Sequence, residues 1–94
     1  MALIDDIKKV LGMTTIAKDA ELADLILSAK LDLKISGVDI IEETDPLIKR
    51  AITVYCQANF VQDNAIAERF LNSYTMLKTH LSLSSDYLVV VEVV

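Results

Sequence analysis

Hydrophobic residues recur at helical spacing through most of the chain, and this pattern predicts four helices. The first is expected at about residues 2–11, where the apolar positions fall within an arc of about 120° and Gly12 ends the pattern. The second is expected at about residues 20–36, with Asp19 as its N-cap and Gly37 as its C-terminal stop.

The second half of the chain predicts an antiparallel pair of helices. Asp45-Pro46 is typical of a helix start, because Asp caps the free N–H groups and Pro at the first position has no N–H to lose. A helix over residues 46–61 is apolar around most of its circumference, which predicts a central position. Its polar strip is limited to Lys49, Arg50, Thr53 and Gln57. A short turn over residues 62–64 then supplies caps for a fourth helix, at about residues 65–81.

The second helix has an additional apolar row on the side opposite its main apolar face. The row consists of Leu27, Leu31 and Ile35, spaced four residues apart. One interpretation is that the helix is buried on both sides within the domain. The other is that the row is a subunit contact, because a small domain has few places to bury two opposite faces of one helix.

The C-terminal residues 86–94 have a different character, with strong β propensity and no Gly or Pro. A single strand needs a partner edge, and three are considered: residues 38–41 of the same chain, a neighbouring subunit, or another protein. The side chains on one face of such a partner strand are Tyr87, Val89, Val91 and Val93. The alternative is a disordered tail. The predicted fold is therefore an all-α bundle over residues 1–83, followed by a β-prone tail over residues 84–94.

Composition supports a single helical domain. The chain has 94 residues, and hydrophobic residues make up 53 % of them while aromatic residues make up only 5 %, so the core must be aliphatic. Two Gly and one Pro leave too little turn chemistry for a multi-stranded sandwich or barrel. The single cysteine excludes an internal disulfide, and no apolar run is long enough for a membrane span, so we expect a soluble chain without membrane contact.

Charge limits the classes of partner. The formal net charge of −5 argues against sequence-specific binding of nucleic acid, which needs a basic face. The predicted loop over residues 37–45 contains four acidic residues and no basic residue. These are Asp39, Glu42, Glu43 and Asp45. The loop lacks the turn glycine and the spacing of a calcium loop, so we expect solvated carboxylates and no metal.

No catalytic or cofactor motif is present. Cys56 lies within an apolar helix, where a free cysteine usually behaves as a small hydrophobic residue, and no third group orients it toward His80. Phosphate-binding glycines and zinc-ligand spacings are missing. The sequence therefore predicts a protein that is not an enzyme and binds no cofactor.

The order of these features resembles that of the head–tail connector (adaptor) proteins of tailed bacteriophages and prophages. The resemblance covers about residues 2–83. It rests on the amphipathic start Leu3–Leu11, the helix opening Asp19-Ala20-Glu21-Leu22, the start Asp45-Pro46-Leu47-Ile48-Lys49-Arg50-Ala51-Ile52, Tyr55, the segment Asn59-Phe60-Val61-Gln62-Asp63-Asn64 and the segment Arg69-Phe70-Leu71-Asn72-Ser73-Tyr74.

The resemblance implies a structural role in the virion. Such connectors are small helical proteins that assemble, in the host cytoplasm, as a ring of about a dozen copies under the portal protein. The ring extends the DNA channel and docks the tail or a head-completion protein. The family has no fixed site motif, so the resemblance assigns no function to an individual residue.

Two unlike surfaces are candidates for a ring interface, which joins different patches of neighbouring copies. One is the row Leu27, Leu31 and Ile35, and the other is a pairing of the loop acids with Lys49, Arg50 or Arg69 of a neighbour. The loop acids are alternatively expected to face the DNA channel, where they would repel phosphate. The competing function is a small cytoplasmic regulatory module that binds one partner without forming a ring.

Overall fold

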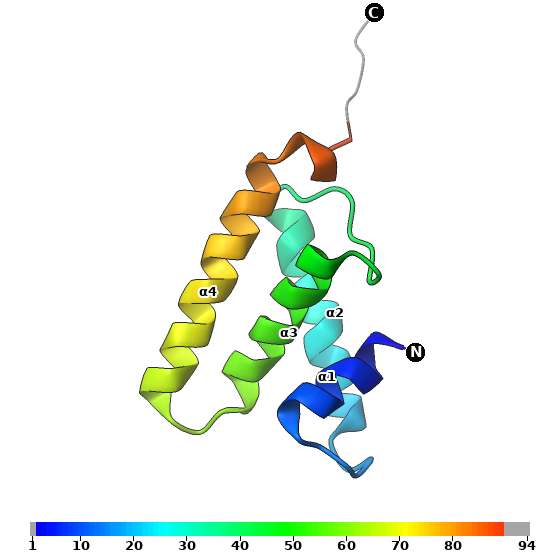
Figure 1. Cartoon of the computed structure of the whole chain (residues 1–94), viewed down its shortest axis with the longest axis vertical. Coiled ribbons are helices and arrows are strands. Elements are labelled where there is room, and N and C mark those ends of the chain that lie inside the picture. The colour runs from blue at the N-terminus through cyan, green and yellow to red at the C-terminus, as the bar shows by residue number, and fades with distance from the viewer. Residues whose placement is uncertain (1, 90–94) are drawn as a thin grey trace, which may run out of the picture.

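The computed structural model describes residues 2–89, and within them it confirms an all-α bundle of four helices (Figure 1). The helices are α1 Leu3–Leu11, α2 Asp19–Ile35, α3 Pro46–Phe60 and α4 Asn64–Leu83, followed by one turn of 3-10 helix, η1, at Ser85–Tyr87. No strand occurs between residues 2 and 89.

Helix α3 is central, as its nearly continuous apolar surface predicts. It forms an antiparallel hairpin with α4 on one side and contacts α2 and α1 on the other (Figure 1). The buried core is aliphatic apart from one cysteine and one tyrosine. It consists of Leu3, Ile7, Leu22, Ile26, Ala29, Leu33, Val38, Ile48, Ala51, Ile52, Val54, Cys56, Tyr74 and Leu81.

Two glycines end the first two helices, as predicted. Gly12 has φ 73° and Gly37 has φ 103°, a region that only glycine enters without strain. After each glycine, the next N–H donates back to a carbonyl of the helix: Met13 to Lys8 at 2.9 Å and Val38 to Leu33 at 3.0 Å. Both ends are therefore Schellman motifs, and the second one turns Val38 into the core.

Side-chain caps start α3 and α4, also as predicted. Asp45 Oδ1 accepts hydrogen bonds from the N–H groups of Leu47 at 2.9 Å and Ile48 at 3.3 Å. Asp63 does the same for the first turn of α4. Each carboxylate satisfies N–H groups that have no partner within the helix, and it also complements the positive end of the helix dipole.

Three local predictions are wrong. Asp19 is the first residue of α2 rather than its N-cap, because its carboxylate lies 2.7 Å from Lys8 Nζ and joins α2 to α1 instead. Helix α4 continues two residues beyond the predicted end, to Leu83. Thr53 was expected on the polar strip of α3 but is buried, since its hydroxyl donates to the Lys49 carbonyl at 2.7 Å and needs no water.

Helix α4 lies along one edge of an elongated molecule whose extents are 52 × 30 × 18 Å (Figure 1). Only Tyr74 and Leu81 of this helix are buried. Several apolar side chains of α4 are exposed, namely Ile66, Leu71, Met76 and Leu83. A domain of this size thus leaves a large part of its longest helix uncovered.

Candidate subunit and partner surfaces

The second apolar row of α2 lies on the surface. Leu27, Leu31 and Ile35 are 57 %, 54 % and 85 % exposed. The buried residues Leu22, Ile26, Ala29 and Leu33 occupy the opposite side of the same helix. The interpretation that α2 is buried on both sides is therefore wrong, because the core is complete without the row.

A groove between α3 and α4 forms another apolar surface. It has a volume of about 460 Å³ and is lined by Arg50, Val54, Ser73, Met76, Leu77 and His80. Val54 and Leu77 supply an apolar floor, while Met76 on the rim is 74 % exposed. We call this surface the α3–α4 groove. The sequence did not reveal it, because which faces of α3 and α4 meet at their shared edge depends on how the two helices pack.

Three of the four loop acids have partners in their own chain. Glu43 forms an ion pair with Lys30 of α2, and Asp45 caps α3. Asp39 accepts a hydrogen bond from the Val89 N–H at 3.0 Å. Glu42 is exposed and forms no ion pair with any residue from 2 to 89.

Of the two basic candidates on α3, one has a partner in its own chain and the other has none among the described residues. Lys49 Nζ lies 2.6 Å from Asp6 Oδ2 of α1, and this hydrogen bond lowers the pKa of the Asp6 carboxyl. Arg50 is exposed at the α3–α4 groove and forms no ion pair within the described part of the chain. Arg50 is therefore the α3 cation that a neighbour meets without first breaking an internal contact.

The beginning of the predicted C-terminal strand contacts the acidic loop. Tyr87 lies in η1, and its carbonyl accepts hydrogen bonds from the N–H groups of Asp39 at 2.9 Å and Ile40 at 3.0 Å. Its ring packs against the core, and its hydroxyl lies 3.0 Å from both carboxylate oxygens of Asp45. Val91 and Val93, which the strand prediction also includes, lie outside the described residues.

These contacts shift two pKa values in opposite directions. Partial burial raises the pKa of the Tyr87 hydroxyl, and its hydrogen bond to the Asp45 carboxylate raises it further. For Asp45, desolvation alone would raise the pKa, but hydrogen bonds from the Ile48 N–H, the Tyr87 hydroxyl and the Leu47 N–H bring it below its usual value. The carboxylate is thus held ionised while it accepts three hydrogen bonds.

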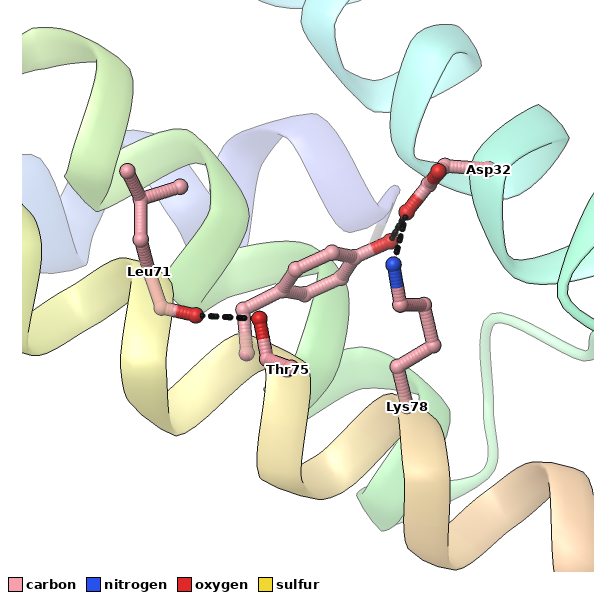
Figure 2. A network of polar contacts seen from close by, with 5 residues as sticks. Asp32, Leu71, Thr75 and Lys78 are labelled. Atoms are coloured by element: carbon pink, nitrogen blue, oxygen red, sulfur yellow. Dashed lines mark hydrogen bonds and ion pairs between the residues drawn. The ribbon is translucent and has the colours of Figure 1, made fainter.

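A polar network between α2 and α4 was not predicted (Figure 2). The Tyr74 hydroxyl donates to Asp32 Oδ2 at 2.5 Å, and Lys78 Nζ lies 3.1 Å from the same oxygen. The hydrogen bond from Tyr74 is the main reason that the pKa of Asp32 is lowered, and burial followed by this bond raises the pKa of Tyr74. Tyr74 lies on the apolar stripe of α4, so periodicity alone assigned it to the core and gave no sign of its polar contact.

The tyrosine ring is fixed by two further contacts. The Tyr55 ring of α3 packs edge-on against Tyr74, with 5.1 Å between the ring centroids. Lys78 Nζ lies 5.2 Å from the centroid of the Tyr74 ring, within reach of a cation–π interaction. The network therefore joins three helices at one point.

The residues considered for catalysis are placed in different environments. Cys56 is fully buried, and desolvation raises the pKa of its thiol to about 11, which disfavours the nucleophilic thiolate. His80 is exposed at the α3–α4 groove. Across residues 2–89, no group of three or more His, Cys, Asp or Glu side chains is arranged to hold a metal ion.

Comparison with protein families identifies the chain. Residues 3–88 match the family described as phage connector protein. The chain belongs to the phage connector protein family. No curated protein and no solved structure matched it. The match confirms the resemblance deduced from the order of helix starts, and it covers nearly the whole described structure of this connector protein.

Membership indicates a structural phage protein of the head–tail connection, with a place in the virion and a role that is not enzymatic. No helix within residues 2–89 of the connector is long and apolar enough to cross a membrane. The features with a bearing on assembly are consequently its surfaces: the exposed α2 row, the α3–α4 groove and the acidic loop.

Proposed function

We propose that this connector assembles as a ring under the portal protein, where it extends the DNA channel and docks the tail or a head-completion protein. The observation that carries the proposal is the exposure of Leu27, Leu31 and Ile35 on a chain whose core is complete without them. Aligned apolar side chains on the surface of a small domain mark an interaction site. Membership of the connector family supports the proposal that this site binds another protein of the head–tail junction.

A ring needs a heterologous interface, in which one patch meets a different patch on the next copy. The α2 row supplies one such patch. Arg50 is the basic residue on α3 that is available for the other, because Lys49 is already paired with Asp6. A ring of about a dozen copies is the stoichiometry that we propose from the resemblance.

The acidic loop is proposed to face the DNA channel. Glu42 is the loop acid that is exposed and has neither an ion pair nor a side-chain hydrogen bond in the described chain, so its charge is the most available to repel phosphate. Asp39, Glu43 and Asp45 contribute negative charge at the same place while they also hold the loop. We therefore expect DNA to pass through the channel without binding to its wall.

The C-terminal segment is proposed to dock on the portal or on a neighbouring subunit as an added strand. The basis of this proposal is the apolar sequence that continues from Val89, a residue that is 60 % exposed. Truncation after Val89 tests this, because it keeps Tyr87 and its contacts with the loop. We expect the helical domain to remain folded by circular dichroism while binding to the portal protein weakens. Unchanged binding would contradict the strand proposal and leave ring formation unaffected.

The decisive experiment for the ring is native mass spectrometry of the full chain across a concentration series, with and without the portal protein. A discrete species of many copies, formed alone or on the portal, is expected. A matched pair of variants links it to the α2 row: Leu31→Glu should abolish the species, whereas Thr79→Glu on the exposed side of α4 should not. A chain that stays monomeric and captures a single copy of one partner would instead indicate a small cytoplasmic binding module that uses the same row.

A further inference from the structure

We propose that the α2 row of one subunit docks into the α3–α4 groove of the next subunit. The proposal rests on the ring described above, and it names the surface that the row occupies. Four observations carry it: the apolar character of both surfaces, the opposite charges of Asp24 and Arg50, the absence of internal ion pairs for these two residues, and the placement of the two surfaces on different helices.

Both surfaces are apolar and unlike in shape, as a heterologous contact requires. The row projects from a single helix, and Leu27 and Leu31 are more than half exposed. The groove is a shallow, open depression that Val54 and Leu77 line, with the exposed Met76 at its rim. A ridge of leucines on one helix fits between two helices in the way that side-chain ridges and grooves pack inside proteins. Met76 is unbranched and adapts to such a ridge.

One residue on each surface carries a charge opposite to that of the other, Asp24 beside the row and Arg50 at the groove. Arg50 and His80 line the groove, and no acidic residue lines it. Asp24 lies three residues before Leu27 and seven before Leu31, so it shares their face of α2. Lys34, three residues after Leu31, lies at the other end of the same face, so the row has an acidic end and a basic end. A register that sets the Asp24 carboxylate against the Arg50 guanidinium is therefore favoured over one that sets Lys34 against it.

These charges are available for a neighbour. Asp24 and Arg50 are both exposed, and neither forms an ion pair with another residue of the described chain. Most of the nearby charges are already used, as in the pairs Lys49–Asp6 and Lys30–Glu43. An intersubunit pair between Asp24 and Arg50 would therefore form without the loss of an internal one.

The placement of the surfaces allows each copy to have two neighbours. The row lies on the side of α2 that faces away from the buried core residues. The groove is lined only by residues of α3 and α4. One subunit can therefore insert its row into a neighbour while its own groove receives the row of another, and this head-to-tail repetition closes into a ring when the rotation per subunit permits.

Charge reversal tests the proposed pair in the full chain. Arg50→Glu and Asp24→Arg should each weaken assembly about tenfold, measured as the concentration at half-assembly, because each leaves like charges opposed. The double variant should return to within about threefold of the unaltered chain. Lys18→Glu is the control, since Lys18 is an exposed basic residue directly before α2 that belongs to neither the row nor the groove. Single variants that behave like this control, or a double variant with no recovery, would overturn the proposal.

Disulfide trapping provides a test that does not depend on charge. Ser28 lies next to the row on α2, and Ser73 lines the groove. A mixture of the Ser28→Cys and Ser73→Cys chains should form mixed dimers under mild oxidation, in preference to a mixture of Thr14→Cys and Ser73→Cys. Thr14 is exposed in the connector between α1 and α2, away from the row. Equal yields from the two mixtures would overturn the proposal.

The two failures are distinguishable. If the chain forms a ring but the row–groove trap and the charge rescue both fail, the docking inference is wrong and the ring remains. If the chain forms no multimer, alone or on the portal protein, the proposed function fails as well.

Discussion

The Tyr87 hydroxyl lies 3.0 Å from both oxygens of the Asp45 carboxylate, the group that also caps α3. The carbonyl of the same tyrosine accepts the N–H groups of Asp39 and Ile40. One residue near the C-terminus thus contacts both ends of the acidic loop, and it joins that loop to the start of the central helix.

Removal of the Tyr87 hydroxyl should destabilise the domain modestly. Tyr87→Phe keeps the ring that packs against the core but loses the hydrogen bond to Asp45, and we expect a loss of about 1 kcal/mol in the free energy of unfolding. Urea denaturation followed by circular dichroism measures it. Tyr55→Phe is the control, because the Tyr55 hydroxyl forms no hydrogen bond with the rest of residues 2–89. Equal effects of the two substitutions would contradict the assigned contact.

Stability should fall in acid because of the paired carboxylates. The pKa values of Asp6, Asp32 and Asp45 are lowered from the ordinary 3.8, so the unfolded chain binds more protons than the folded chain around that pH. Their stabilisation is complete above the ordinary value and is lost as the pH falls from there through the lower folded values. We expect the urea midpoint to decrease below about pH 5.

The network between α2 and α4 should account for part of this acid sensitivity. Asp32→Asn removes the titrating group that faces Tyr74 and Lys78, so it should lower stability at pH 7 and flatten the acid side of the profile. Asp24→Asn, on the exposed face of the same helix, serves as the control and should leave the profile unchanged in a dilute monomer. An Asp32→Asn profile parallel to that of the unaltered chain would show that the network does not contribute.

Substitutions on the two sides of α2 should separate assembly from stability. Leu31→Glu changes an exposed residue, so the free energy of unfolding should stay within about 0.5 kcal/mol, while the native mass shifts toward monomer. Leu33→Ala changes a fully buried residue two positions away and should cost about 2–5 kcal/mol. A Leu31→Glu chain that unfolds as readily as the Leu33→Ala chain would mean that the row is part of the core.

Cys56 should react slowly in the folded protein. Its thiol is buried and has a pKa of about 11, so a disulfide reagent at pH 8 should label it at a rate limited by local opening of the structure. Labelling in 8 M urea, a condition chosen to unfold the chain, provides the reference rate. A folded-state rate close to this reference would revive the possibility of a reactive cysteine.

The charge of the acidic loop is best tested at Glu42. Glu42→Lys should increase retention of duplex DNA by the assembled protein at low salt without a loss of stability, because Glu42 forms no ion pair in the described structure. Glu43→Lys should in addition loosen the loop, since it places a lysine against Lys30. Loss of assembly with negligible DNA binding in both variants would contradict a channel position for the loop.

The sequence predicted the parts of the fold that depend on local signals. The helix-start and helix-end signals act on backbone groups within a few residues of themselves, so they can be predicted without knowledge of the fold. These signals are Gly12, Asp45-Pro46 and Asp63. Asp19 shows the limit of this reasoning. A carboxylate at a helix start can cap the helix or pair with a distant lysine. The carboxylate of Asp19 pairs with Lys8 because α1 packs on α2, and the local sequence does not encode that packing.

The sequence also predicted only the local part of the candidate surfaces. The periodicity of Leu27, Leu31 and Ile35 is visible in the sequence, but whether the row is covered depends on how many helices surround α2. The α3–α4 groove, the Tyr74–Asp32 contact and the Tyr87–Asp45 contact each join elements that are distant in the sequence. Neither propensity nor periodicity encodes such pairings, because both describe a single element at a time.

The contacts of η1 also determine the position of the last described residues of the chain. Tyr87 places the described end of the chain beside the loop over residues 37–45, at the same end of the molecule (Figure 1). Any assembly related by rotational symmetry would repeat this neighbourhood in every copy. In such a ring the acidic loops and the C-terminal segments would alternate around one circumference. A substitution in the loop would then alter both the repulsion of DNA and the attachment of a protein partner.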